Sequence, residues 1–452
     1  MGSISNITSF GDEAIWEGLV QVMILMMGIL AGNIIRRKLS LVKKSLIPSA
    51  LLGGVIILLL KLIPFFKMLI NQPIMETVTY HCLAIGFIAL ALKTTTKKKD
   101  HPFRDVIVTG IVEGSSYIIQ AMFGLVFTVI LALATGFFPG AGTLLAMGFG
   151  QGTGQALNYG KLYETDYGFE GGTTFGLTIA TMGFFVACIV GVVYMNILRR
   201  KGKLHISTDE EKNTETLATY IGENEIPNTE SVDKLTVNLC LIFFIYGLVY
   251  LIMRAVNVNL VWGFNFLLGT LVTLLVRVLI NLLKKGKVLH LEPTNNFLLD
   301  RIAGTAFDVM IIAGVSAINL QELSDMWLQI LGICTIGAVV TFTYLRIVTR
   351  KMYPGYTEEA FFSIFGTMTG TASNGVILLR EIDPAFETPA ANNLVLAGIP
   401  TIVIAGGLLV ICSYAPKGLK EAAISIGITL VAFIILNIVL FVIHKKTVNS
   451  TY

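Results

Sequence analysis

The side chains best suited to binding chemistry in this 452-residue sequence lie in two segments that share a pattern. The first reads Gly150-Gln-Gly-Thr-Gly-Gln-Ala-Leu-Asn158, and the second, 216 residues later, reads Gly366-Thr-Met-Thr-Gly-Thr-Ala-Ser-Asn374. Five of the nine positions agree. Glycine leaves backbone groups uncovered, and Thr, Asn and Gln add neutral oxygens, so these segments could replace water around Na⁺. Helix N-termini within them would present N–H groups to a carboxylate.

These residue types favour contacts to a small anionic substrate and to a hard cation, with no cofactor and no conventional metalloenzyme ligand set. Alternatively, the small residues only allow close helix packing. Arg380 is the nearest positive charge after the second segment, although Glu381 and Asp383 could pair with it in an interfacial cluster. Na⁺ contacts are predicted from Asn158 and Asn374. Substrate contacts are predicted from Gln151, Gly152, Thr153, Gly154, Gln155, Thr369, Gly370, Thr371, Ser373, Asn374 and Arg380.

Two carboxylic acids lie inside apolar segments, where a charge costs at least ~2.5 kcal/mol at the membrane centre. Glu113 and Asp308 each stand seven or more residues from the nearer segment end. Either could ligate Na⁺ or carry a proton. For Asp308, an ion pair with Arg301, two turns away on one helix face, is an equal alternative. Other ionisable groups are expected to snorkel to the interface or to sit in the core: Lys61, Arg254, Arg277, Arg346 and His81.

The elements that must position these residues are membrane helices. Charged residues make up 14% of the chain and apolar residues 54%, with a mean hydropathy of +0.76. Such a composition predicts a polytopic membrane protein rather than a soluble fold. The formal charge of +4 gives no indication of nucleic-acid binding. All five cysteines lie in apolar runs without metal-ligand spacing, and no basic region precedes the first apolar run, which is expected to stay as a span.

Hydropathy predicts eleven spans, and basic clusters follow alternate ones. The positive-inside rule then places the N-terminus outside and the C-terminus in the cytoplasm of a cell membrane. The predicted spans are 16–35, 46–63, 75–92, 106–135, 174–198, 235–253, 261–283, 297–320, 327–349, 389–413 and 418–443.

Residues 140–165 and 358–383 are too short or too glycine-rich to cross as ordinary helices, and each is predicted to form a re-entrant hairpin. The fold class is therefore all-α, with two inverted-topology repeats of five spans plus one hairpin each and one extra C-terminal span. The repeats are 1–198 and 235–413, a polar cytoplasmic linker covers 199–234, and the extra span and tail cover 414–452. Inverted repeats with broken helices near the midplane are typical of secondary transporters.

At these residues the sequence resembles the sodium/glutamate symporter family. The likeness is strongest from Gly148-Phe-Gly-Gln-Gly-Thr-Gly-Gln-Ala156 to Arg200, where Gln151 stands in the place of the histidine in the family's Gly-Gly-His-Gly-Thr-Gly signature. The segment from Glu358 to Pro400 resembles the family's second glycine-rich hairpin and the helix that follows it. Within this segment, Gly366–Gly375 departs further from the family's glycine-rich sequence.

The resemblance implies Na⁺-coupled symport of glutamate or a related acidic amino acid. It also implies alternating access by movement of a hairpin-bearing portion against a scaffold, and a homodimer in the lipid bilayer. The alternatives are an H⁺-coupled carboxylate transporter and a channel. An enzyme is not predicted, since the sequence has no GxxxxGK[ST], HExxH or GxSxG motif.

Overall fold

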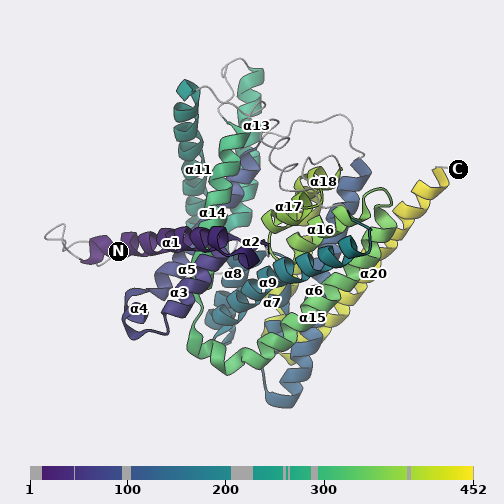
Figure 1. The fold of residues 1–452 in the computed structure, drawn as a ribbon, viewed down its shortest axis with the longest axis horizontal. Coiled ribbons are helices and arrows are strands. Elements are labelled where there is room, and N and C mark those ends of the chain that lie inside the picture. Colours follow the sequence, from purple (N-terminus) through teal and green to yellow (C-terminus); the bar gives the residue numbers. More distant parts are fainter. Residues whose placement is uncertain are drawn as a thin grey trace. The chain divides into compact units, whose positions relative to one another are not determined.

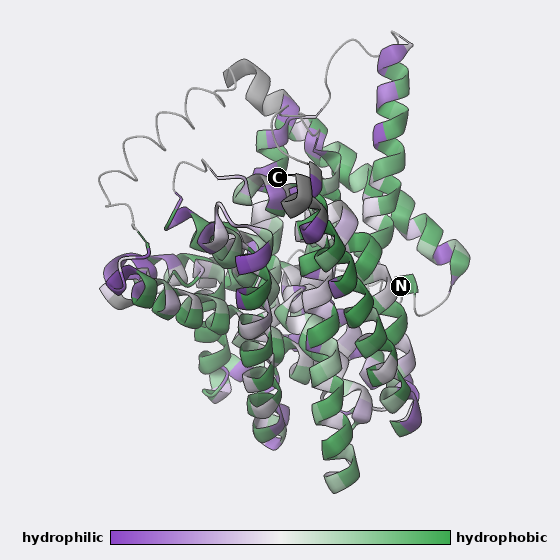
Figure 2. Cartoon of the chain, turned by 90° about the vertical axis from the view of Figure 1, so that its right-hand side faces the viewer, coloured by the Kyte–Doolittle hydropathy of each residue, from purple (hydrophilic) through white to green (hydrophobic). Residues whose placement is uncertain are grey.

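The computed structural model describes residues 13–44, 46–93, 103–204, 228–257, 261–262, 265–286, 294–383 and 388–450. All regular structure within these residues is helical (Figure 1). Most helices are apolar along their length, with polar residues near their ends (Figure 2). Within the described ranges, nine helices are long and apolar enough to cross a membrane: Trp16–Lys38, Gln72–Leu92, Arg104–Thr135, Gly172–Arg200, Lys234–Val256, Asn265–Lys285, Leu320–Met352, Pro400–Lys417 and Leu419–Lys445. The protein is thus an all-helical, multi-pass membrane protein, as predicted.

Two of the eleven predicted spans are not among these nine. In the segment 46–63, α3 covers only Ser49–Leu60, about 18 Å at 1.5 Å per residue against a hydrocarbon core of about 30 Å. Pro48 precedes α3 and Pro64 begins the next short helix, α4 (Pro64–Leu69). In the segment 297–320, α14 (Asn296–Ala317) has 22 residues, but every stretch of 18 residues within it holds three charged residues, whereas each of the nine has such a stretch with at most two.

The chain divides into two compact units. The first comprises the described parts of residues 1–35, 48–97 and 218–317. Besides α3, α4 and α14, it holds α1 (Glu13–Lys38) up to residue 35, α5 (Gln72–Leu92), α11 (Asn228–Val256) and α13 (Asn265–Lys285). Glycines let these helices approach closely: a Cβ on Gly86 of α5 would stand 2.5 Å from Cε1 of Phe307 in α14, and one on Gly53 of α3 would clash with the backbone of Gly28 in α1.

Basic side chains of the first unit bind helix ends. Lys61 Nζ donates to the oxygen of Ser316 at 3.1 Å, and Arg277 donates to the oxygen of Ala91 at 3.1 Å. Both acceptors lie one residue before the C-terminus of their helix, where carbonyls lack helical partners and the helix dipole favours a cation. His81, expected in the core, is exposed on this unit and lies 2.6 Å from the Tyr246 hydroxyl.

The second unit comprises the described parts of residues 36–47, 98–217 and 318–452. Its long helices are α6 (Phe103–Thr135), α9 (Gly172–Arg200), α15 (Leu320–Met352) and α20 (Leu419–Ser450). Between them stand shorter pieces: α2 (Ser40–Lys44), η1 (Pro139–Thr143), α7 (Leu144–Phe149), α8 (Gly152–Tyr167), α16 (Thr357–Thr369), α17 (Ala372–Arg380), α18 (Ala390–Leu396), α19 (Gly398–Tyr414) and η2 (Ala415–Lys417). Of the predicted linker 199–234, residues 205–227 lie outside the described residues.

The start of α16 is fixed by an ion pair between Arg346 of α15 and Glu358. The guanidinium donates from two nitrogens to the two carboxylate oxygens, at 2.9 and 2.6 Å. It also lies over the rings of Tyr194 and Phe361, 5.5 and 5.7 Å from their centroids. Arg346 was expected to snorkel to an interface, but this paired and stacked site, with its side chain only 12% exposed, explains its position better.

Arg346→Lys should lower the free energy of unfolding by about 2 kcal/mol, because an ammonium group cannot reproduce the two-pronged hydrogen bonding or the stacking. Thermal melting of purified protein in detergent measures the change. Arg350→Lys, at an exposed position of the same helix, is the matched control and should melt like the wild type. Equal melting of the two variants would contradict the structural role of the ion pair.

Candidate functional site

The first glycine-rich segment is a helix interrupted at two residues. α7 ends at Phe149, Gly150 and Gln151 are not helical, and α8 begins at Gly152. Gly152 has a φ of +78°, a backbone conformation that residues other than glycine rarely adopt. A Cβ on Gly150 would clash with the ring of Tyr117 in α6. Glycine is therefore required at both positions, at Gly152 for its backbone conformation and at Gly150 for the close approach of Tyr117.

The second glycine-rich segment is interrupted in the same way. α16 ends at Thr369, and α17 begins two residues later. The two helices lie against each other, since a Cβ on Gly375 of α17 would clash with the oxygen of Ser363 in α16. At the break, the Thr371 hydroxyl donates to Oδ1 of Asn374 at 3.3 Å, and the Asn374 amide nitrogen lies 4.0 Å from the sulfur of Cys188 in α9.

The two breaks, 220 residues apart, meet in space. A Cβ on Gly152 would lie 3.4 Å from Cγ2 of Thr371 and 3.6 Å from the oxygen of Gly370. On α9, Gly183 lies beside both interruptions, because its Cβ would stand 2.5 Å from the oxygen of Thr369 and 3.0 Å from a ring carbon of Phe149. The two segments that sequence similarity relates thus meet at their breaks within the second unit.

Helix α6 is hydrogen-bonded to the first break and to the end of α16, just before the second. Tyr117 donates to the oxygen of Gly150 at 3.3 Å. Gln120 donates from Nε2 to the oxygen of Met368 at 2.8 Å and to the hydroxyl of Thr341 in α15 at 2.9 Å. Sequence reasoning missed Tyr117 and Gln120, although together with Glu113 they recur at intervals of four and three residues, which places all three on one helix face.

Several polar atoms at this site are buried without a hydrogen-bond partner among the described residues. They are the Thr153 hydroxyl, both amide atoms of Gln155, and Oε1 of Gln120. Thr153 is 0% and Gln155 1% exposed. Leaving a buried polar group unpaired costs about 1–3 kcal/mol. Such a cost is understandable where a bound ion or substrate completes the hydrogen bonds.

The helices that follow the breaks start without side-chain caps. Gln151 precedes α8 and Thr371 precedes α17, and neither side chain accepts a hydrogen bond from its own helix's first turn. Uncapped first-turn N–H groups and the positive dipole end attract an anion. The site therefore combines backbone groups that could bind an anion with neutral oxygens and amides, and in the described part of the chain no charged side chain is hydrogen-bonded to either break.

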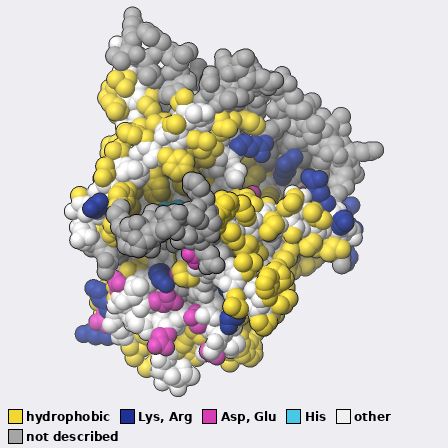
Figure 3. Space-filling model, turned by 90° about the vertical axis from the view of Figure 1, so that its left-hand side faces the viewer, with side chains coloured by type: hydrophobic (Ala, Val, Ile, Leu, Met, Phe, Trp, Pro, Cys, Tyr) yellow, Lys and Arg dark blue, Asp and Glu magenta, His cyan; other side chains and the backbone are white. Residues whose placement is uncertain are grey.

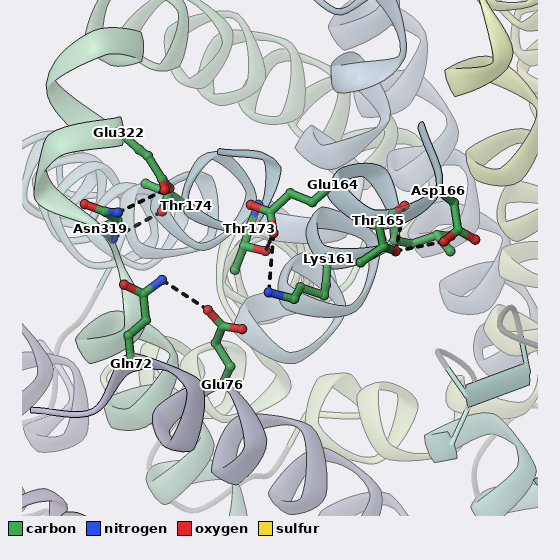
Figure 4. Close-up of polar contacts among 11 residues, drawn as sticks. Gln72, Glu76, Lys161, Glu164, Thr165, Asp166, Thr173, Thr174, Asn319 and Glu322 are labelled. Atoms are coloured by element: carbon green, nitrogen blue, oxygen red, sulfur yellow. Dashed lines mark hydrogen bonds and ion pairs between the residues drawn. The ribbon is translucent and has the colours of Figure 1, made fainter. Parts of the chain in front are cut away.

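At its far end, α8 is tied to α9 by a carboxylate. Glu164 accepts hydrogen bonds from the backbone nitrogen of Thr173 at 2.9 Å and from its hydroxyl at 2.7 Å, and Lys161 approaches the same carboxylate at 3.5 Å (Figure 4). Thr173 lies in the first turn of α9, so the negative charge also meets the favourable end of the helix dipole. This contact fixes α8 at the end opposite the break.

Other predicted site residues lie elsewhere. Arg380 is exposed at the last position of α17, about 12 Å along the helix from the break. Asn158 is buried in α8, beyond its first turn. Asp308 is exposed on α14 of the first unit, and Arg301, its predicted partner, instead lies over the ring of Phe297 at 5.1 Å.

Ser373 and Glu113 are two further predicted site residues. The side chain of Ser373 lies outside the described part of the structure. Glu113 is buried on α6, one turn before Tyr117, with Oε2 lying 2.7 Å from the hydroxyl of Thr401 in α19. The breaks thus gather the Gln151–Gln155 and Thr369–Asn374 groups, while Glu113 forms a separate buried contact.

Comparison with known protein families matches residues 15–365 to the sodium/glutamate symporter family. The match covers most of the chain, so the protein belongs to this family of secondary transporters. It includes the whole of the first broken segment and stops within α16, just before Gly366 begins the second motif. No curated protein matches the chain. Family membership makes Na⁺ the coupling ion and agrees with a non-enzymatic role.

Proposed function

We propose that this protein couples the inward movement of Na⁺ to uptake of glutamate or a related acidic amino acid. The observation that carries the proposal is the meeting of the two breaks beside Thr153 and Gln155, whose buried polar atoms have no hydrogen-bond partner in the described structure. Na⁺ takes oxygen ligands of the kind that these side chains and the uncovered carbonyls provide. The substrate carboxylates bind at the first turns of α8 and α17.

The division into units supports the proposed inverted repeat. Each half of the chain places its first three predicted spans in the first unit, and its fourth and fifth spans with its broken segment in the second. Two halves of unrelated architecture have no reason to divide at the same point. In the proposed mechanism the second unit is the moving, substrate-carrying part, the first is the scaffold, and the broken segments are re-entrant.

The membrane setting of this proposal is a cell membrane with the N-terminus outside and the C-terminus in the cytoplasm. Figure 3 shows hydrophobic side chains over broad areas of the visible face, as expected of a surface in lipid. The family resemblance adds a homodimer, which we keep as part of the proposal. Asp308, exposed on an apolar helix of the scaffold, remains a candidate Na⁺ or proton ligand.

Uptake of labelled glutamate into proteoliposomes, with and without an inward Na⁺ gradient, tests the function. We expect saturable accumulation that requires Na⁺, with aspartate, dicarboxylates and neutral amino acids as competitors that define the substrate class. Flux that rises linearly with concentration, without accumulation, would indicate a channel. Accumulation that does not depend on Na⁺ but depends on a proton gradient would instead support the H⁺-coupled transporter.

A further inference from the structure

Thr401, in the first turn of α19, stands between two oxygen atoms. Its Oγ1 lies 2.7 Å from Oε2 of Glu113 and 2.7 Å from the backbone oxygen of Ala397. Both separations are typical of O–H···O hydrogen bonds. One hydroxyl group therefore contacts two potential acceptors equally closely.

The hydrogens available to these three oxygens indicate the protonation state of Glu113. A threonine hydroxyl has one hydrogen and donates one such bond, while the oxygen of Ala397 has none to give. Both short contacts are full hydrogen bonds only when Glu113 donates to Thr401 and Thr401 donates to Ala397. An ionised carboxylate only accepts. The geometry is therefore that of Glu113 as a neutral carboxylic acid.

The environment of Glu113 offers it no counter-charge. The residue is 4% exposed, and no Lys, Arg or His forms an ion pair with it in the described structure. The titratable groups that face it are the phenols of Tyr117, on α6, and Tyr353, just after α15. Buried charges are normally paired, so an acid in such a place is favoured in its neutral form.

The helices packed against α6 supply no compensating cation either. α7, α18, α19 and η1 contain no Asp, Glu, Lys, Arg or His, and the charges of α20 stand at its two ends. On α15 they lie within the first and last two turns, where Arg346 pairs with Glu358 of α16, beside Glu359. The nearest acid along α6 is Asp105, two turns away.

A line of polar side chains leads from Glu113 to the N-terminal end of α6. One turn away, the hydroxyls of Thr109 and Tyr353 lie 2.8 Å apart. A further turn away, Tyr356 donates to Oδ2 of Asp105 at 2.6 Å. Burial and the Asp105 carboxylate raise the pKa of Tyr356, so its phenol keeps the hydrogen that it donates. These groups provide hydrogen-bonding partners along a path from the helix end to Glu113.

We propose that Glu113 is a proton-binding site whose proton exchanges with water during the transport cycle. On release, the proton leaves to water, the carboxylate accepts the hydrogen of Thr401, and the bond from Thr401 to Ala397 is lost. Ala397 is the residue at which α18 passes into α19, so the loss changes the hydrogen bonding of that junction. This site adds a proton to the Na⁺ coupling and does not depend on which substrate is carried.

Infrared spectroscopy of the purified protein in saturating Na⁺ tests the protonation state without any transport. The wild type should show a protonated-carboxyl C=O band at pH 7 that Glu113→Gln removes. Glu170→Gln, which removes an exposed carboxylate between α8 and α9, is the matched control and should leave the band intact. A wild type without the band, or a band that survives Glu113→Gln, overturns the proposal.

A second measurement covers the case in which Glu113→Gln does not fold. Thr401→Val removes the hydroxyl that accepts the hydrogen bond from Glu113, so the carboxyl band should shift toward that of a weakly hydrogen-bonded acid. An unshifted band would contradict the assignment.

In proteoliposomes with an internal pH dye, Glu113→Gln should exchange substrate across the membrane while the proton movement that accompanies wild-type transport is lost. Equal proton movement in both proteins would also overturn the proposal.

Discussion

Replacing Gln155 by Met should abolish Na⁺-driven uptake and yet leave the protein at least as stable as the wild type. Both amide atoms of Gln155 are buried without a hydrogen-bond partner in the described structure. The free-energy cost of removing them from water is therefore not offset by hydrogen bonds within the protein. A methionine of similar length removes that penalty, which predicts a gain of about 1–2 kcal/mol in the free energy of unfolding without ligand. Uptake should fall at least about 100-fold, since lost ligand contacts of about 2.7 kcal/mol correspond to that factor.

Paired threonine variants control this experiment. Thr153→Val removes an unpartnered hydroxyl at the site, whereas Thr349→Val removes a buried hydroxyl in α15 that donates to the oxygen of Leu345 at 2.8 Å. The first should lose uptake without losing stability, and the second should retain uptake. Melting temperature in detergent and initial uptake rate give both quantities. Wild-type uptake in both Gln155→Met and Thr153→Val would remove these residues from the site.

Local sequence patterns predicted the positions of both breaks. The segments 140–165 and 358–383 contain the interruptions at 150–151 and 370–371, because glycine conformations and repeated motifs are local properties. Pro48 and Pro64 flank α3 and indicate its short length from sequence alone. The average hydropathy of residues 46–63 does not show this, because it is not sensitive to where a helix begins and ends. Averages over a window report apolar content and not helix length.

The partners of the site residues could not be predicted in the same way. Gln120 and Thr341 are separated by 221 residues, and nothing local to either indicates that they share a hydrogen bond. Arg380 was chosen because it is close in sequence to the second motif, yet a nine-residue helix carries it away from the break. Nearness in sequence becomes nearness in space only where the chain turns, and α17 runs straight from Ala372 to Arg380.

The meeting of the two breaks leads to a prediction that separates backbone strain from loss of the site. In Gly152→Leu, the new Cβ would lie 3.4 Å from Cγ2 of Thr371, and the rest of the leucine side chain has to fit beyond it. The substitution should therefore push the second break away from the first. It also forces a leucine into a φ of +78°. The strain alone costs about 1–2 kcal/mol and would lower stability wherever it occurs.

Gly168 supplies the matched control for that strain. It ends α8 with a φ of +71°, but the space around it is open, with nothing within 4 Å of an added Cβ. Gly168→Leu should therefore lose similar stability and keep uptake within a few-fold of the wild type, whereas Gly152→Leu should lose uptake at least about 100-fold, about 2.7 kcal/mol of binding energy. Melting temperatures and initial uptake rates of the two variants, measured side by side, decide the point. If both variants lost uptake equally, backbone strain would explain the effect, and the contact between the breaks would have no part in transport.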